Sequence, residues 1–176
     1  MKRLLLWLPL TAFAMLFAVV ASGLFRPSDN LIHSQMVGKP LPKFSLPAMV
    51  PGTPGLGSAM FLDGKPRLLN VFASWCIPCM AESPQLMALK QQGVAIDAVA
   101  VRDTPENIAA FLKRFGDPYE RIGDDRQSAL QLALGSSGVP ETYIIDGHGR
   151  IVDQHIGDIR AEDIPDILAA LKKAGA

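Results

Sequence analysis

The chain has 176 residues, of which 49% are hydrophobic, and its 17 basic and 17 acidic side chains give a net charge of zero. Domains usually contain about 100–200 residues, so this length predicts one domain with room for a short appendage. The charges are mixed along the chain and form no basic stripe, which argues against nucleic-acid binding, where phosphate neutralisation dominates affinity.

The N-terminus is apolar. A run without charge, Leu4 to Phe25, follows the basic pair Lys2-Arg3. As a helix this run would span about 33 Å, enough to cross a hydrocarbon core of about 30 Å. We predict that residues 1–25 are an uncleaved membrane anchor (a signal-anchor) with the basic pair on the cytoplasmic side. The alternative is a cleaved signal peptide, because Val19-Val20-Ala21 offers small residues at a possible cut. In both cases the remainder is exported to a compartment where thiols tend to be oxidised.

Residues 26–39 are polar and aperiodic, which is typical of a tether. The remaining residues, 40–176, are predicted to form one folded domain. Its first part is rich in proline and glycine and cannot be helical, although residues 43–46 are compatible with a short edge strand.

From residue 67 onward the pattern alternates between apolar strands and helices. Thr104 and Pro105 are typical of a helix start, with Thr104 as the N-cap. This order implies a mixed central sheet with helices on both faces. The expected strands are 68–72, 94–101, 142–145 and 150–156, and the expected helices are 77–91, 105–115, 126–134 and 161–173.

The only two cysteines, Cys76 and Cys79, fall where the first buried strand meets its helix. Unsatisfied N–H groups at a helix start favour an anion, so the pKa of the Cys76 thiol should fall from about 8.5 toward 7. Cys79 is about one helical turn away, so its sulfur can reach Cys76 and act as the resolving thiol. The pattern therefore favours reversible dithiol–disulfide exchange.

Two cysteines exclude a disulfide-rich scaffold and a four-cysteine zinc site. A c-type haem attachment motif requires histidine directly after the second cysteine, where this chain has Met80. A metal site would need ligands from the three histidines, His33, His148 and His155. We expect no metal, but a copper chaperone using Cys76, Cys79 and His155 remains an alternative.

A second motif, Gly138-Val139-Pro140-Glu141-Thr142, directly precedes a strand. A proline that faces a dithiol is best placed with a cis peptide bond, because this exposes the backbone of Val139 to an extended substrate. The cis form costs little free energy when the following residue is proline. The alternative is an ordinary proline at the start of a strand. Trp75 is expected to shield the dithiol, unless it only packs beside it.

The segments NVFASWCIPCMAESP and GVPETYIIDGHGRI resemble the thioredoxin superfamily, and within it the membrane-anchored DsbE/CcmG-type thiol–disulfide interchange proteins of cytochrome c biogenesis. The resemblance covers about residues 37–172. The resemblance to the DsbE/CcmG type, as opposed to the superfamily as a whole, depends on Glu82, Glu141 and the inserted segment VAVRDTPENIAAFLKRFGDPYERIGDD. It implies a thioredoxin-like α/β fold, a cis Val139–Pro140 bond, and Cys76 as the attacking thiolate.

The resemblance also implies that Glu82 exchanges a proton with Cys79, which lies three residues earlier on the same helix face. Glu141 would add negative charge near Cys76, which opposes thiolate formation, and would steer the choice of partner. The alternatives are a solvated carboxylate at Glu82 and a surface charge at the strand edge for Glu141.

As a function, the resemblance implies a membrane-anchored periplasmic reductase. Its client would be apocytochrome c or a haem-ligation subunit that carries thiols, and its electrons would come from a membrane thiol carrier. No cofactor is expected, because the two sulfurs carry both electrons. A general thioredoxin-like reductase with another client is the main alternative, and the direction of electron flow stays open.

Overall fold

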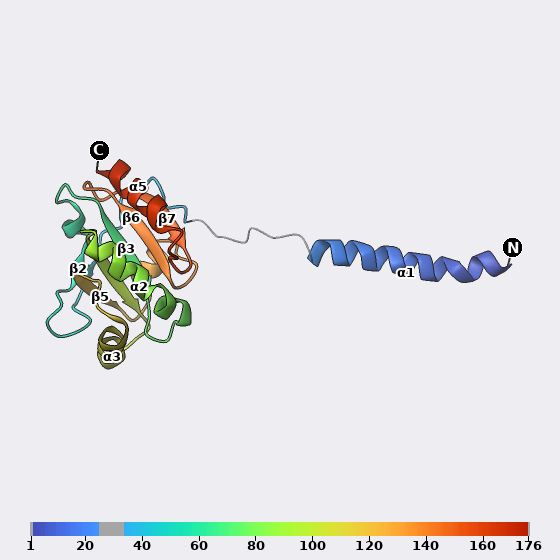
Figure 1. Cartoon of the computed structure of the whole chain (residues 1–176), viewed down its shortest axis with the longest axis horizontal. Coiled ribbons are helices and arrows are strands. Elements are labelled where there is room, and N and C mark those ends of the chain that lie inside the picture. The colour runs from blue at the N-terminus through green and yellow to red at the C-terminus, as the bar shows by residue number, and fades with distance from the viewer. Residues whose placement is uncertain (1, 25–33, 176) are drawn as a thin grey trace. The chain divides into compact units, whose positions relative to one another are not determined.

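The structure, a computed structural model, describes residues 2–24 and 34–175, which fall into two compact units. The first is the helix α1 (Lys2–Leu24), which continues through Pro9 (Figure 1). Among the described residues, no helix has both the length and the apolarity needed to cross a membrane. The helix expected near the N-terminus is therefore present, whereas its role as an anchor is not shown. Residues 26–33 of the expected tether lie outside the described residues.

The second unit is built on a five-stranded mixed sheet. Its strand order is β5-β4-β3-β6-β7, with β3, β4 and β5 parallel and with β6 and β7 antiparallel to their neighbours. The strands are β3 (Arg67–Phe72), β4 (Ile96–Val101), β5 (Arg121–Asp125), β6 (Glu141–Ile145) and β7 (Ile151–Ile156). The central strands β3, β4 and β6 are buried along their whole length, although each contains one or two polar or charged residues.

The helices are α2 (Ile77–Gln91), α3 (Pro105–Phe115), α4 (Ala129–Ala133) and α5 (Ile164–Ala174). Side chains alternate between the faces of a sheet, so Asn70 and Phe72 of β3 share one face. Asn70 bonds to Glu82 of α2, and the Phe72 ring lies 5.6 Å from the ring of Phe111 in α3. Residues of α5 line a small cavity with Ile144, whose side chain lies on that same face.

The opposite face contacts α4. The hydroxyl oxygen of Tyr143, a neighbour of Ile144 in β6, lies 3.5 Å from the carbonyl oxygen of Leu134 at the end of α4. Helices therefore cover both faces of the sheet, as the sequence predicted. The boundaries of α2 and α3 also agree with the prediction, and Thr104 caps α3 through Asn107 (3.3 Å).

The edge strand β5 was not predicted. It pairs with β4 and also supports a short antiparallel hairpin, β1 (Ser45–Leu46) and β2 (Leu56–Gly57), followed by a 3-10 turn at Ser58–Phe61. A Cβ atom at Gly123 would lie 2.8 Å from a methyl carbon of Leu46 and 3.1 Å from Leu56. Glycine at this position therefore lets the hairpin pack closely on the edge of the sheet.

The folded domain includes residues before position 40. The backbone N–H of Ser34 donates to Gln154 of β7 (2.7 Å), and Gly38 donates to the carbonyl of Ile151 (2.7 Å). The Ser34 hydroxyl also donates to the carbonyl of Leu134. Residues 34–39, assigned to the tether from their polar composition, therefore pack against β7 through hydrogen bonds that composition does not reveal.

Candidate active site

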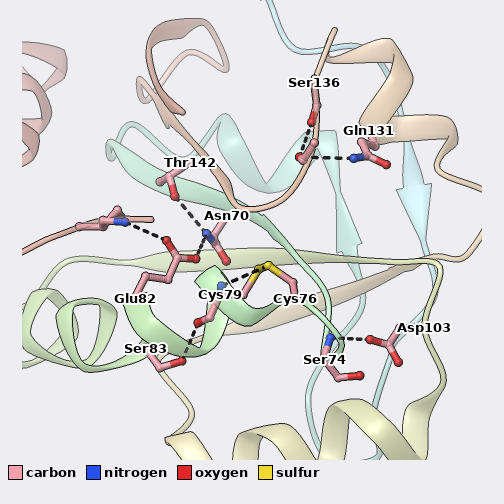
Figure 2. The surroundings of a disulfide bond; sticks show 12 residues. Asn70, Ser74, Cys76, Cys79, Glu82, Ser83, Asp103, Gln131, Ser136 and Thr142 are labelled. Atoms are coloured by element: carbon pink, nitrogen blue, oxygen red, sulfur yellow. Dashed lines mark hydrogen bonds between the residues drawn. A yellow bond between two sulfur atoms is a disulfide. The ribbon is translucent and has the colours of Figure 1, made fainter. Parts of the chain in front are cut away.

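Cys76 and Cys79 form a disulfide at the start of α2, with an S–S distance of 2.07 Å (Figure 2). Cys76 is the N-cap of the helix, and its sulfur accepts a hydrogen bond from the Cys79 backbone N–H (3.1 Å). Pro78 occupies the first turn, where no intrahelical donor is lost. The predicted position at a helix N-terminus is confirmed, and the same N–H groups would stabilise a Cys76 thiolate after reduction.

Both cysteines are buried, with exposed fractions of 4% for Cys76 and 2% for Cys79. The residues beside Cys76 are not: Trp75 is 52% exposed and Ile77 is 77% exposed. Trp75 therefore lies at the rim of the disulfide and outside the core. The two exposed apolar side chains, Trp75 and Ile77, therefore flank the buried Cys76 in the chain.

The turn before Cys76 is held by the turn that follows β4. The Asp103 carboxylate accepts a hydrogen bond from the backbone N–H of Ser74 (2.6 Å, Figure 2). It also accepts one from the backbone N–H of Thr104 (2.8 Å). The Trp75 indole N–H donates to the carbonyl of Arg102 (3.2 Å), a residue with a left-handed backbone (φ 48°). Sequence reasoning missed Asp103. Its signal is its place just after β4, at the same sheet edge as the residues that follow β3.

Glu82 of α2 is fully buried. Its carboxylate accepts hydrogen bonds from the Asn70 amide (3.0 Å) and from the backbone N–H of Ile159 (3.1 Å) (Figure 2). Burial raises the pKa of Glu82 to about 7, against the smaller lowering effect of these two hydrogen bonds. The alternative of a solvated carboxylate is therefore wrong, because the side chain points inward. A carboxyl group with a pKa near neutrality is suited to exchange a proton.

The Val139–Pro140 bond is cis, as the family resemblance implied. Because Glu141 pairs with Val71, Pro140 lies beside the C-terminal end of β3, where the chain leads into Cys76 and α2. The carbonyl of Gly138, two residues before Pro140, accepts hydrogen bonds from the Ser136 hydroxyl (2.9 Å) and the Gln131 amide (3.4 Å) (Figure 2). The structure thus brings the proline loop to the same end of the sheet as the disulfide.

Glu141 is buried, with an exposed fraction of 1%, so the alternative of a surface charge is wrong. Its carboxylate accepts hydrogen bonds from the Ser137 backbone and hydroxyl (2.9 and 2.6 Å), the Tyr143 hydroxyl (2.8 Å) and the Gln154 amide (3.3 Å). These contacts lie on the sheet face opposite to Asn70. They hold the loop that leads to Pro140, and a steering contact between Glu141 and a client stays a prediction.

The two histidines in the described part of the chain belong to β7 and to the turn that precedes it. His155 pairs with Thr142 across β6 and β7, and its ring lies 3.3 Å from the carbonyl of Asp158 and 3.8 Å from the Asp163 carboxylate. His148 lies in the turn between these strands, and His33 lies outside the described residues. Within residues 2–24 and 34–175, no group of three or more His, Cys, Asp or Glu side chains is arranged to hold a metal ion.

A disulfide that closes over one helical turn, at the same end of the sheet as a cis-proline loop and on the same helix as a buried carboxyl group, can accept and release two electrons by exchange with another disulfide. On this fold, that chemistry defines a thioredoxin-like thiol–disulfide oxidoreductase.

Comparisons with known proteins agree with this class. The Redoxin family profile matches residues 36–171. The chain is 39% identical to the thiol:disulfide interchange protein DsbE of Pseudomonas fluorescens over 99% of this chain and 96% of the relative. It is 37% identical to the thiol:disulfide interchange protein HelX of Rhodobacter capsulatus, over 93% and 92% of the two chains.

Among solved structures, a putative DsbE from Chlorobium tepidum superimposes with a TM-score of 0.62 at 24% identity, over 83% of this chain and all of that one. The chain therefore belongs to the Redoxin family and, within it, to the thiol:disulfide interchange proteins of the DsbE and HelX type. It is accordingly a thiol–disulfide interchange enzyme with Cys76 and Cys79 as its redox pair.

Proposed function

We propose that this protein is a reductant outside the cytoplasmic membrane that reduces disulfides in apocytochrome c, or in a haem-ligation partner, before haem attachment. The disulfide motif at the N-terminus of α2 is the observation that carries the proposal. The kinship with interchange proteins over nearly the whole chain supports it. No cofactor enters the reaction, because the two sulfurs hold both electrons.

In the reduced enzyme, the Cys76 thiolate attacks the client disulfide, and one client sulfur leaves as a thiolate. The Cys79 thiol then gives its proton to the Glu82 carboxylate and attacks the sulfur of Cys76. The second client sulfur leaves, so the client gains two electrons and the Cys76–Cys79 disulfide forms. A membrane thiol carrier that draws on cytoplasmic thioredoxin would return the enzyme to its dithiol form.

A Cys79→Ser variant tests the client, because it cannot resolve the mixed disulfide at Cys76. Expressed in intact membranes, it is expected to accumulate a covalent complex with apocytochrome c or a haem-ligation subunit that thiol reductants release. The matched variant Cys76→Ser should trap neither. Exclusive recovery of unrelated clients would instead indicate a general reductase.

The reduction potential tests the direction of electron flow. A reductant is expected near the potential of thioredoxin, about −270 mV, whereas a disulfide donor resembles DsbA at about −120 mV. Equilibration of the full chain with glutathione and dithiothreitol buffers measures it. A value at the oxidising end would overturn the reductant role.

We also propose that the N-terminal segment attaches the domain to the inner membrane. The support is the sequence, in which the uncharged run to Phe25 follows Lys2 and Arg3. The full chain should stay in the membrane fraction after extraction at alkaline pH and dissolve in detergent. Release of the intact chain by alkaline extraction alone would contradict this attachment.

A further inference from the structure

Asn70 is the polar residue at the centre of β3, whose sequence is RLLNVF, and it is fully buried. A side-chain amide offers two N–H bonds at one end and an acceptor oxygen at the other. Buried polar groups are normally paired, so a buried asparagine in an apolar strand must have partners at both ends.

Three hydrogen bonds meet this requirement. The amide nitrogen donates to the carboxylate of Glu82 and to the hydroxyl of Thr142, both at 3.0 Å (Figure 2). The amide oxygen accepts from the hydroxyl of Tyr119 at 2.9 Å. Rotating the amide by half a turn would place its oxygen against the Glu82 carboxylate and its N–H groups against the Tyr119 hydroxyl. Because that hydroxyl donates its proton to the amide oxygen, it favours the orientation in which the amide nitrogen faces Glu82.

We propose that Asn70 is a positioning residue for Glu82, and that Tyr119 holds the Asn70 amide in the orientation that donates to the carboxylate. This inference rests on the proposed role of Glu82 as the proton acceptor for Cys79. Tyr119 lies between α3 and β5, within the inserted segment VAVRDTPENIAAFLKRFGDPYERIGDD. Through Asn70, the insertion is thereby linked to the buried carboxyl group of Glu82.

The charges around Glu82 explain why this contact matters. Asp158, in the loop after β7, adds negative charge that raises the pKa of Glu82, as does burial. Burial and the charges of Glu82 and Asp117 raise the pKa of Tyr119, so its hydroxyl keeps the proton that it donates. Cys79, one turn earlier on α2, is the group with which the proton is exchanged. The Asn70 donor favours the carboxylate form and opposes the effects of burial and Asp158.

Tyr119→Phe tests the inference with the loss of one oxygen atom, and it keeps the ring that packs 4.9 Å from the ring of Phe72. The readout is the pKa of Glu82, followed by carboxyl carbon NMR in the oxidised full chain in detergent. We expect the pKa to rise by at least half a unit. Asn70→Ser, whose hydroxyl is too short to reach Glu82, should raise it further.

Tyr143→Phe is the matched control, because it removes another buried hydroxyl that donates to a carboxylate, that of Glu141, on the opposite face of the sheet. It should leave the pKa of Glu82 unchanged. An unchanged pKa in Tyr119→Phe, or an equal rise in Tyr143→Phe, would overturn the positioning role.

The kinetics separate this inference from the proposed function. The pH midpoint for release of a mixed disulfide should move upward in Tyr119→Phe, and Glu82→Gln should abolish that pH dependence. If Glu82→Gln leaves the profile intact while Tyr119→Phe still shifts the NMR titration, the proton-acceptor role fails and the positioning role stands.

Discussion

At the scale of single residues, the burial of Glu82 makes stability depend on pH. In the unfolded chain this carboxyl group ionises near pH 4.5, whereas the native environment keeps it protonated until about pH 7. Between these values the native state binds more protons than the unfolded state. The contribution of Glu82 to the free energy of unfolding is therefore fully present below pH 4.5 and is lost as the pH rises through about 7.

Glu82→Gln should remove this pH dependence. We expect the stability of the oxidised wild type, relative to the variant, to fall by about 3 kcal/mol from acid to neutral pH, because one pKa unit corresponds to about 1.36 kcal/mol. Urea unfolding of both proteins between pH 4 and 8 measures the difference. Glu162→Gln, at the surface, controls for the loss of one negative charge. If the free energies of unfolding of wild type and Glu82→Gln changed in parallel with pH, the raised pKa of the buried Glu82 carboxyl group would be contradicted.

At the scale of elements, the site depends on contact between two turns, one after β3 and one after β4. The carboxylate of Asp103 holds the Ser74 backbone, and the Arg102 carbonyl holds the Trp75 indole. Neither bond is part of a regular element. Together they fix the residues that lead into the N-terminus of α2.

Asp103→Ala should free the turn before Cys76. We expect a loss of about 1–3 kcal/mol in stability, since the half-buried N–H of Ser74 loses its charged acceptor, together with a change in Trp75 fluorescence. Thr104→Ala is the matched control: it removes the N-cap of α3, costs about 1 kcal/mol, and leaves the Ser74 contact in place. Equal fluorescence spectra for the two variants would show that Asp103 acts only on α3.

Local sequence signals predicted α2 and α3 well, because their boundaries are set by residues at the helix ends, such as the cap Thr104 and the start Pro105. The strand β5 carries no such signal. Its sequence RIGDD is mostly charged, and its extended form depends on pairing with β4, where Arg121 lies opposite Asp97 and 3.4 Å from its carboxylate. Tertiary pairing of this kind overrides local propensity.

At the scale of the whole molecule, the site gathers segments that are distant in sequence at one end of the sheet. The parallel strands β3 and β4 end there, and the antiparallel strand β6 begins there. The cysteine pair was predictable because its chemistry depends on a spacing of one helical turn. The burial of Glu82 and Glu141 was not, because their partners Asn70, Ile159 and Ser137 come together only in the folded chain.

The same dependence on distant packing applies to the hairpin on β5. Gly123→Ala should lower stability by about 1–3 kcal/mol, because the added carbon overlaps Leu46 and Leu56. Gly57→Ala, in the hairpin itself, is the control, since its added carbon would approach nothing closer than 3.6 Å. Thermal unfolding of both variants distinguishes them, and equal losses would argue against close packing at Gly123.

The proposed reaction depends most directly on the Cys76 thiolate at the N-terminus of α2. The rate of alkylation of Cys76 by iodoacetamide, measured against pH in the reduced full chain, reports the pKa of this thiol. Repeating the titration in Glu82→Gln separates the thiol from the nearby carboxyl group. We expect a pKa near 7, where a thiol at a helix N-terminus ionises, and a return to about 8.5 in urea. A value of 8.5 or above in the folded protein would contradict thiolate stabilisation by the helix.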